Sequence, residues 1–175
     1  MKCMACNYSR AEGKVKSMKN GISALFGMAA GAAAGGIVAG TASAKKMKEM
    51  AEVHAKVHEL YMAFDQWLQI RQEGKTLVEY FTKNGYQTVA VYGMRELGAR
   101  LCDELKGSGV TVSYAIDKNA DAIYADVDVV TPDGVLADVD VIVVTAITYF
   151  DEIEEMLDEK VDCPIISLED ILYEV

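Results

Sequence analysis

The stretch TVAVYGMRELGARLCDEL, residues 88–105, decides the fold of this 175-residue chain. Residues 88–92 form a near-continuous apolar run, which is typical of a strand whose sheet is covered on both faces. A helical pattern follows through Leu97, Leu101 and Leu105, and glycines lie between the two elements. A strand, a glycine turn and a helix in this order predict the first unit of a parallel α/β sheet.

The rest of the C-terminal half repeats this alternation of short β-rich runs and helical patterns. Helices are expected at residues 151–160, where Thr148 and Asp151 form a capping pattern, and after Ser167, which caps the last helix. We therefore predict an α/β domain over residues 85–175, built on a doubly wound parallel sheet of about five strands. The strands that follow the first one are expected at residues 110–116, 126–130, 140–146 and 164–167.

Three segments of different composition precede this domain. Residues 1–20 are basic, residues 21–44 are rich in glycine and alanine, and residues 45–84 show an amphipathic helical pattern. The whole chain is acidic, with a formal net charge of −10. Because phosphate backbones require clustered lysine and arginine, no nucleic-acid partner is expected.

The glycine- and alanine-rich segment, residues 21–44, contains no charged residue. It is long enough for a helix to cross a bilayer, and lysines flank it on both sides. Gly27, Gly31 and Gly35 recur at every fourth position, as in a glycine zipper, and make a stripe along which another helix can approach closely. We expect a transmembrane helix or a packing helix that holds the protein at the cytoplasmic face of a membrane. A flexible linker in a cytoplasmic protein is the alternative, and a single pass is not distinguished from a re-entrant hairpin.

An apolar stripe with heptad spacing runs along the helical segment that follows. About two and a half heptads are present, which favours self-association through a coiled coil. An amphipathic helix packed on its own domain explains the same spacing equally well. The stripe alternates steps of three and four residues and consists of Met50, Val53, Val57, Leu60, Phe64 and Trp67.

The turn after the first strand carries a nucleotide-binding pattern. Residues 93–98, GMRELG, read as G-x-G-x-x-G with Arg95 in place of the middle glycine. The first glycine allows a tight turn, the last allows close helix packing, and free amides at the helix start can bind an anion. Asp117 ends the second strand 19 residues after Gly98, near the spacing at which an acid binds ribose hydroxyls.

Arg95 stands where the pattern normally has a glycine, which lets the backbone approach a pyrophosphate. Two interpretations of Arg95 are therefore open. Its guanidinium could instead grip a phosphate, or it could close the site. Asp117 also has a plainer reading, as the polar start of a loop. The residues expected to contact the ligand are Gly93, Met94, Arg95, Leu97, Gly98, Asp117, Lys118 and Thr145.

The runs VAVYGMRELGARLCDEL, VSYAIDKN, VDVIVVTA and CPIISLEDIL carry a resemblance to known proteins. Together they resemble the small Rossmann-like modules found beside bacterial glycosyltransferases and other polysaccharide-biosynthesis proteins. They are also similar to the N-terminal nucleotide-binding domain of sugar acyltransferases. The resemblance covers residues 67–175 and implies a Rossmann-like fold that binds NAD(P) or a nucleotide sugar. Such modules usually read G-M-G where this chain has Gly93, Met94 and Arg95.

Catalytic residues are not evident in the α/β half, which contains no histidine. Cys3 and Cys6 form a lone C-x-x-C without a second ligand pair, so no metal site is expected. We therefore favour a membrane-tethered, self-associating regulatory module that binds a nucleotide-type small molecule. A minimal NAD(P)-dependent oxidoreductase or a nucleotide-sugar enzyme subunit is the first alternative. A structural membrane adaptor without a ligand is the second.

Overall fold

The computed structural model describes the backbone of residues 21–175 and the side chains of residues 44–175. A compact unit spans Glu52–Val175 and contains the whole α/β domain. Residues 1–20, with Cys3 and Cys6, lie outside the described part, as do the side chains of the glycine stripe.

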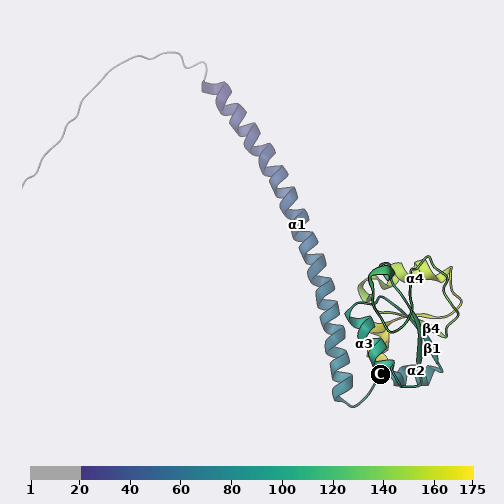
Figure 1. The fold of residues 1–175 in the computed structure, drawn as a ribbon. Coiled ribbons are helices and arrows are strands. Elements are labelled where there is room, and N and C mark those ends of the chain that lie inside the picture. Colours follow the sequence, from purple (N-terminus) through teal and green to yellow (C-terminus); the bar gives the residue numbers. More distant parts are fainter. Residues whose placement is uncertain (1–20) are drawn as a thin grey trace, which may run out of the picture. The chain divides into compact units, whose positions relative to one another are not determined.

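Five parallel strands form one sheet with the order β3-β2-β1-β4-β5. The neighbouring strands β1 and β4 are labelled in Figure 1. The order reverses direction between β1 and β4, which is the doubly wound arrangement of a Rossmann-like fold. The predicted fold class is therefore confirmed. The strands are β1 (Thr88–Tyr92), β2 (Thr111–Ile116), β3 (Val129–Val130), β4 (Val141–Val144) and β5 (Ile165–Ser167).

Helices cover both faces of this sheet. α3 and α5 pack on the face that receives Val89 and Val91 of β1, and α4 packs on the face that receives Ala90 and Tyr92. The connection from β2 to β3 contains a single 3-10 turn, η1 (Ala120–Ala122), where doubly wound folds commonly place a helix. The remaining elements are α1 (Gly21–Gln72), α2 (Val78–Asn84), α3 (Glu96–Leu105), η2 (Ile147–Tyr149), α4 (Phe150–Asp158) and α5 (Leu168–Glu174).

Local signals in the sequence were right at some element ends and wrong at others. Ser167 caps α5 as predicted, because its side chain accepts a hydrogen bond from the backbone N–H of Glu169. The capping pattern at Thr148 was wrong, since η2 occupies that position and α4 begins at Phe150 without a side-chain cap. The third strand is shorter than predicted, because pairing with β2 joins only Val129 and Val130.

The heptad stripe of α1 divides between two environments. Leu60, Phe64 and Trp67 pack against the core of the α/β domain, as an amphipathic helix would. Val53 and Val57 remain 62% and 60% exposed. The packing explanation therefore holds for the C-terminal part of the stripe, and the self-association explanation stays a prediction for the rest.

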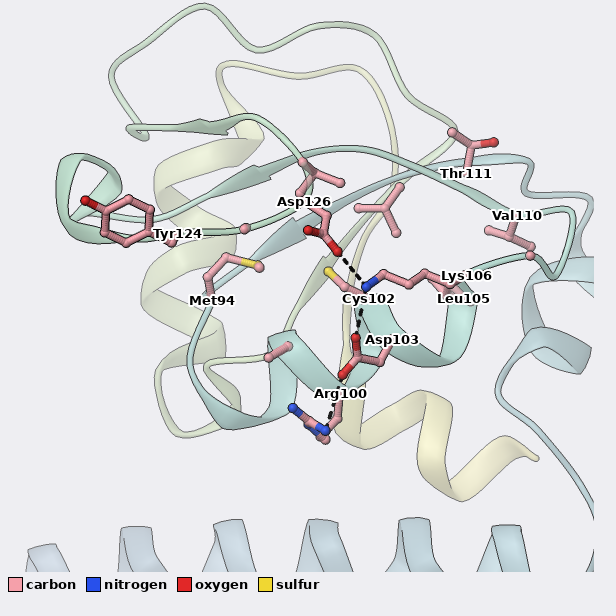
Figure 2. Close-up of a pocket in the computed structure, with 15 residues that line it drawn as sticks. Met94, Arg100, Cys102, Asp103, Leu105, Lys106, Val110, Thr111, Tyr124 and Asp126 are labelled. Atoms are coloured by element: carbon pink, nitrogen blue, oxygen red, sulfur yellow. Dashed lines mark hydrogen bonds and ion pairs between the residues drawn. The ribbon is translucent and has the colours of Figure 1, made fainter.

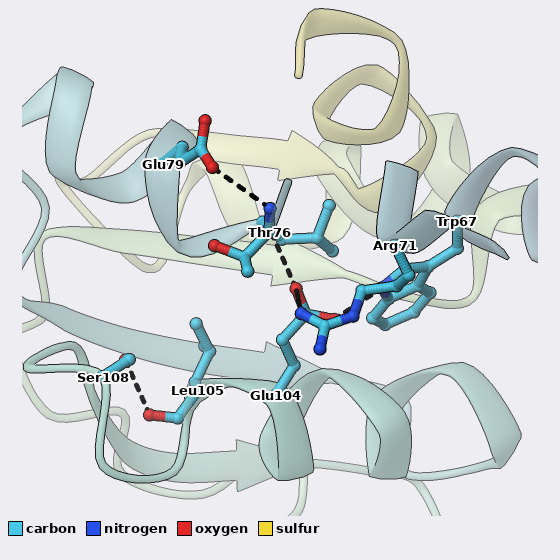
Figure 3. Close-up of polar contacts among 8 residues, drawn as sticks. Trp67, Arg71, Thr76, Glu79, Glu104, Leu105 and Ser108 are labelled. Atoms are coloured by element: carbon cyan, nitrogen blue, oxygen red, sulfur yellow. Dashed lines mark hydrogen bonds and ion pairs between the residues drawn. The ribbon is translucent and has the colours of Figure 1, made fainter. Parts of the chain in front are cut away.

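A buried carboxylate fixes the C-terminal end of α1 to α3 (Figure 3). The indole N–H of Trp67 donates to Glu104 Oε2 at 2.6 Å, and the backbone N–H of Leu77 donates to Glu104 Oε1 at 2.7 Å. Arg71 adds an ion pair at 3.6 Å, and the Glu104 side chain is only 11% exposed. These contacts join the helix end, the chain that follows it and the first crossover helix of the sheet.

Within the described residues 44–175, no helix is long and apolar enough to cross a bilayer. The predicted transmembrane helix over residues 21–44 therefore stays a prediction. From Lys45 onward, α1 carries charged residues on most turns, and this is why that stretch is not apolar enough to cross a bilayer. Most of that prediction fell on residues 21–43, whose side chains lie outside the described part.

Candidate functional site

The carboxyl end of β1 turns tightly into α3 through two glycines. Gly93 adopts a φ of +93°, a left-handed conformation that side chains disfavour. A Cβ atom at Gly98 would collide with the carbonyl oxygen of Gly93. The two glycines thus have the roles predicted for the first and last positions of the pattern, a tight turn and close packing of helix on strand.

Thr145, which directly follows the neighbouring strand β4, stabilises this turn. Its hydroxyl donates toward the carbonyl oxygens of Tyr92 and Gly93, and the residue is buried. Added bulk at Gly93 or Gly98 would approach the same hydroxyl to 3.1 Å. The geometry therefore gives Thr145 a structural role at the turn, while the predicted ligand contact stays a prediction.

The N-terminus of α3 lies directly after the turn. Arg95 is the N-cap residue in an extended conformation, and its side chain does not cap the helix. The first backbone N–H groups of a helix have no intrahelical acceptor, and such groups can donate hydrogen bonds to an anion. Arg95 is exposed, and within residues 44–175 its guanidinium makes no ion pair with a carboxylate. Leu97 is buried in the core, so only its backbone can face a ligand.

Asp117, the predicted ribose-binding acid, lies at the end of β2 and reaches across to the turn. Its Oδ2 accepts a hydrogen bond from the backbone N–H of Met94 at 3.0 Å, and its Oδ1 accepts one from Asn119 at 2.8 Å. A carboxylate offers about four acceptor positions, so roughly half of them remain for a ligand. The structure brings Asp117 together with Gly93 and Met94, whereas Lys118 is exposed on the following turn.

A groove of about 540 Å³ runs along α3 on the side of β2 (Figure 2). It lies where the β2–β3 connection contains no long helix, and Met94 lines the end of the groove nearest the glycine turn. Tyr124 lines it too and is fully exposed. Lys106 reaches from α3 to Asp126 on the opposite wall, with an Nζ–Oδ2 distance of 2.7 Å. Of the predicted site residues, Met94 alone lines this groove.

Cys102 also lines the groove, and its thiol is a group of nucleophilic type. Burial raises the pKa of its thiol, and the neighbouring Asp103 carboxylate adds to the increase. The thiol is consequently protonated at neutral pH and a poor nucleophile. Among the described side chains, no cluster of three or more histidine, cysteine or acidic residues could hold a metal ion.

Two residues of the candidate site, at the end of β1 and in the β2–β3 connection, were not identified from the sequence. Tyr124 belongs to an irregular connection, and nothing in its local pattern indicated a groove. Tyr92 ends the strand TVAVY, and its hydroxyl is buried without a hydrogen-bond partner among the described residues. A polar aromatic residue at the end of an aliphatic strand, beside the glycine turn, was the signal that could have identified it.

Comparison of the chain with protein-family models, with curated proteins and with solved structures finds no match. The Rossmann-like arrangement therefore rests on the sheet itself, and no relative supports the resemblance to polysaccharide-biosynthesis modules.

Proposed function

We propose that residues 52–175 form a module that binds a nucleotide-type small molecule, either NAD(P) or a nucleotide sugar. The observation that carries the proposal is the glycine turn at the switch between β1 and β4. There, the Asp117 carboxylate accepts a hydrogen bond from Met94 in the short loop that leads into the uncapped N-terminus of α3. Ligands of doubly wound sheets bind outside the carboxyl ends of the strands at such a switch.

The parts of a nucleotide match this arrangement in order. A phosphate is an anion and suits the α3 amides together with the guanidinium of Arg95. A ribose donates hydrogen bonds and suits the remaining acceptor positions of Asp117. The groove beside Met94 has a volume in the range of small-molecule sites, and the exposed ring of Tyr124 offers a stacking surface for a base.

Isothermal titration of the full chain with NAD, NADP and UDP-glucose tests the proposal. Arg95→Ala should weaken binding about tenfold, the scale of one lost charge-assisted hydrogen bond. Lys83→Ala removes an exposed cation from α2 and should leave the affinity unchanged. Absence of binding by the wild-type chain at millimolar ligand, or equal affinities of the two variants, would contradict the proposal.

A regulatory or binding role fits this site better than an independent reaction. The described residues near the turn offer carboxylates and a protonated thiol, but no nucleophile paired with a base. An oxidoreductase or nucleotide-sugar enzyme subunit would therefore need a partner that supplies the reacting groups. Turnover of NADPH or UDP-glucose by the purified chain alone would favour that alternative.

We propose self-association as a second property, carried by the exposed apolar face of α1. Seven of the eleven large hydrophobic residues that are exposed in the described part belong to this helix. An exposed apolar face of this length is typical of an interaction surface, and heptad spacing suits a second copy of the same helix.

Attachment to the cytoplasmic face of a membrane through residues 21–44 also stays a proposal. Its support is the uncharged composition of that segment between flanking lysines. Co-sedimentation of the full chain with anionic lipid vesicles is the measurement. Recovery of all protein in the supernatant would contradict the proposal and would favour a cytoplasmic module.

A further inference from the structure

Tyr92 has a buried hydroxyl without a hydrogen-bond partner in the described part of the chain. The residue is 4% exposed and ends β1, immediately before Gly93. Buried polar groups in proteins are nearly always paired, because an unpaired one loses its bonds to water without compensation. Phenylalanine would fill the same space without this cost, so the hydroxyl calls for an explanation.

Tyr92 stands at the carboxyl edge of the sheet, where the ligand is proposed to bind, and its side chain packs on the face that α4 covers. Burial raises the pKa of Tyr92, and the carboxylates of Asp117 and Asp133 raise it further. These acids follow β2 and β3, as Tyr92 ends β1, so all three residues stand at the carboxyl ends of neighbouring strands. Both carboxylates are engaged elsewhere, Asp117 by backbone amides and Asp133 by Lys160 at 3.0 Å.

We infer that the Tyr92 hydroxyl is a ligand-binding group, and that together with Asp117 it binds a hydroxyl of the ligand's sugar. This inference rests on the proposed nucleotide-binding function and adds a residue to its site. A sugar hydroxyl can donate to a carboxylate and accept from a phenol at the same time. A phosphate cannot donate in this way, and two nearby carboxylates would repel it.

Access to the hydroxyl requires movement of a neighbouring turn, since the oxygen is closed to solvent. The turns that carry Asp117 and Asp133 are the candidates, and most of their residues are exposed. Exposed turns with few buried contacts open at low free-energy cost. Binding of the sugar would then exchange an unpaired hydroxyl for a paired one.

A matched pair of tyrosine variants tests the inference in the full chain. Tyr114 lies in the same core cluster as Tyr92, but its hydroxyl donates to the carbonyl oxygen of Ala137 at 2.8 Å. Tyr92→Phe should raise the urea midpoint of the ligand-free protein and weaken binding of NAD or UDP-glucose about tenfold. Tyr114→Phe should lower the midpoint and leave the affinity unchanged.

Each outcome of the titrations and the urea denaturation counts for or against the inference. Wild-type affinity in Tyr92→Phe would overturn it, even if that variant were stabilised. A lower midpoint in Tyr92→Phe would also overturn it, because the hydroxyl would then have a partner in the free protein, such as a buried water. If the wild-type chain binds neither NAD nor UDP-glucose, the proposed function fails first and the inference fails with it.

Discussion

Two stretches of α1 share one apolar heptad pattern and have different surroundings. Around Leu60 and Trp67 the helix packs into the α/β domain, and Trp67 is only 6% exposed. Around Val53 and Val57 the same spacing leaves large apolar side chains in contact with solvent. Heptad spacing therefore predicts which face of a helix is apolar, but it does not predict what covers that face.

Polar contacts hold the C-terminal stretch of α1 to the α/β domain. Near its C-terminal end, α1 meets Glu104 through Trp67 and Arg71, and Gln66 donates to the carbonyl oxygen of Leu172 on α5. Directional bonds of this kind fix the rotation of the helix on the domain. Between Val53 and Val57, the Lys56 ammonium lies over the ring of Tyr149, 3.9 Å from its centre, while both valines stay exposed to solvent.

The largest expected effect is the difference in the free energy of unfolding between substitutions in the packed and in the exposed stretch of α1. Trp67→Ala should lower the free energy of unfolding by about 3–5 kcal/mol, because it leaves a cavity and strands one oxygen of Glu104. Val57→Ala removes exposed apolar surface and should change it by less than about 0.5 kcal/mol. Urea denaturation of the full chain measures both. Similar losses in the two variants would contradict the distinction between packed and exposed stretches.

An intermediate effect is expected at the buried carboxylate itself. Glu104→Ala leaves the N–H groups of Trp67 and Leu77 without their acceptor and should cost about 2 kcal/mol of stability. Glu59→Ala, an exposed carboxylate on α1, is the matched control and should be nearly neutral. If Glu104→Ala were as stable as the wild-type chain, another contact would have to hold the end of α1.

Much of the fold could be predicted because it depends on local patterns. The run at residues 88–92 is almost continuously apolar, as is typical of a central parallel strand, and β1 has those same bounds. Gly85 ends α2 in a left-handed conformation, as glycine commonly does just after a helix. The short β3 could not be predicted, since its length depends on pairing with β2 rather than on its own residues.

The candidate site was predictable to the extent that it depends on backbone geometry. Gly93 and Gly98 have the conformation and the close contact that their pattern indicates. Two features could not be predicted: the hydrogen bond from the Thr145 hydroxyl to the carbonyl oxygen of Tyr92, and the missing partner of the Tyr92 hydroxyl. Both depend on which neighbours the packed sheet supplies. Sequence spacing places a side chain on a strand, whereas its hydrogen-bond partners come from other strands.

The smallest expected effect concerns the exposed stretch of α1, and it tests self-association most directly. Val57→Lys places a charge on the apolar face that is proposed to meet a second copy, and should weaken association about tenfold. Met62→Lys is the matched control, because five positions correspond to about 140° around a helix, away from that face. Light scattering of the full chain across a concentration series measures both variants. Leu60→Lys should weaken association too, but it should also lower stability, because Leu60 packs on the domain. If the wild-type chain remained monomeric at every concentration, the exposed face would not join two copies, and its heptad spacing would be a coincidence of the packed stretch beside it.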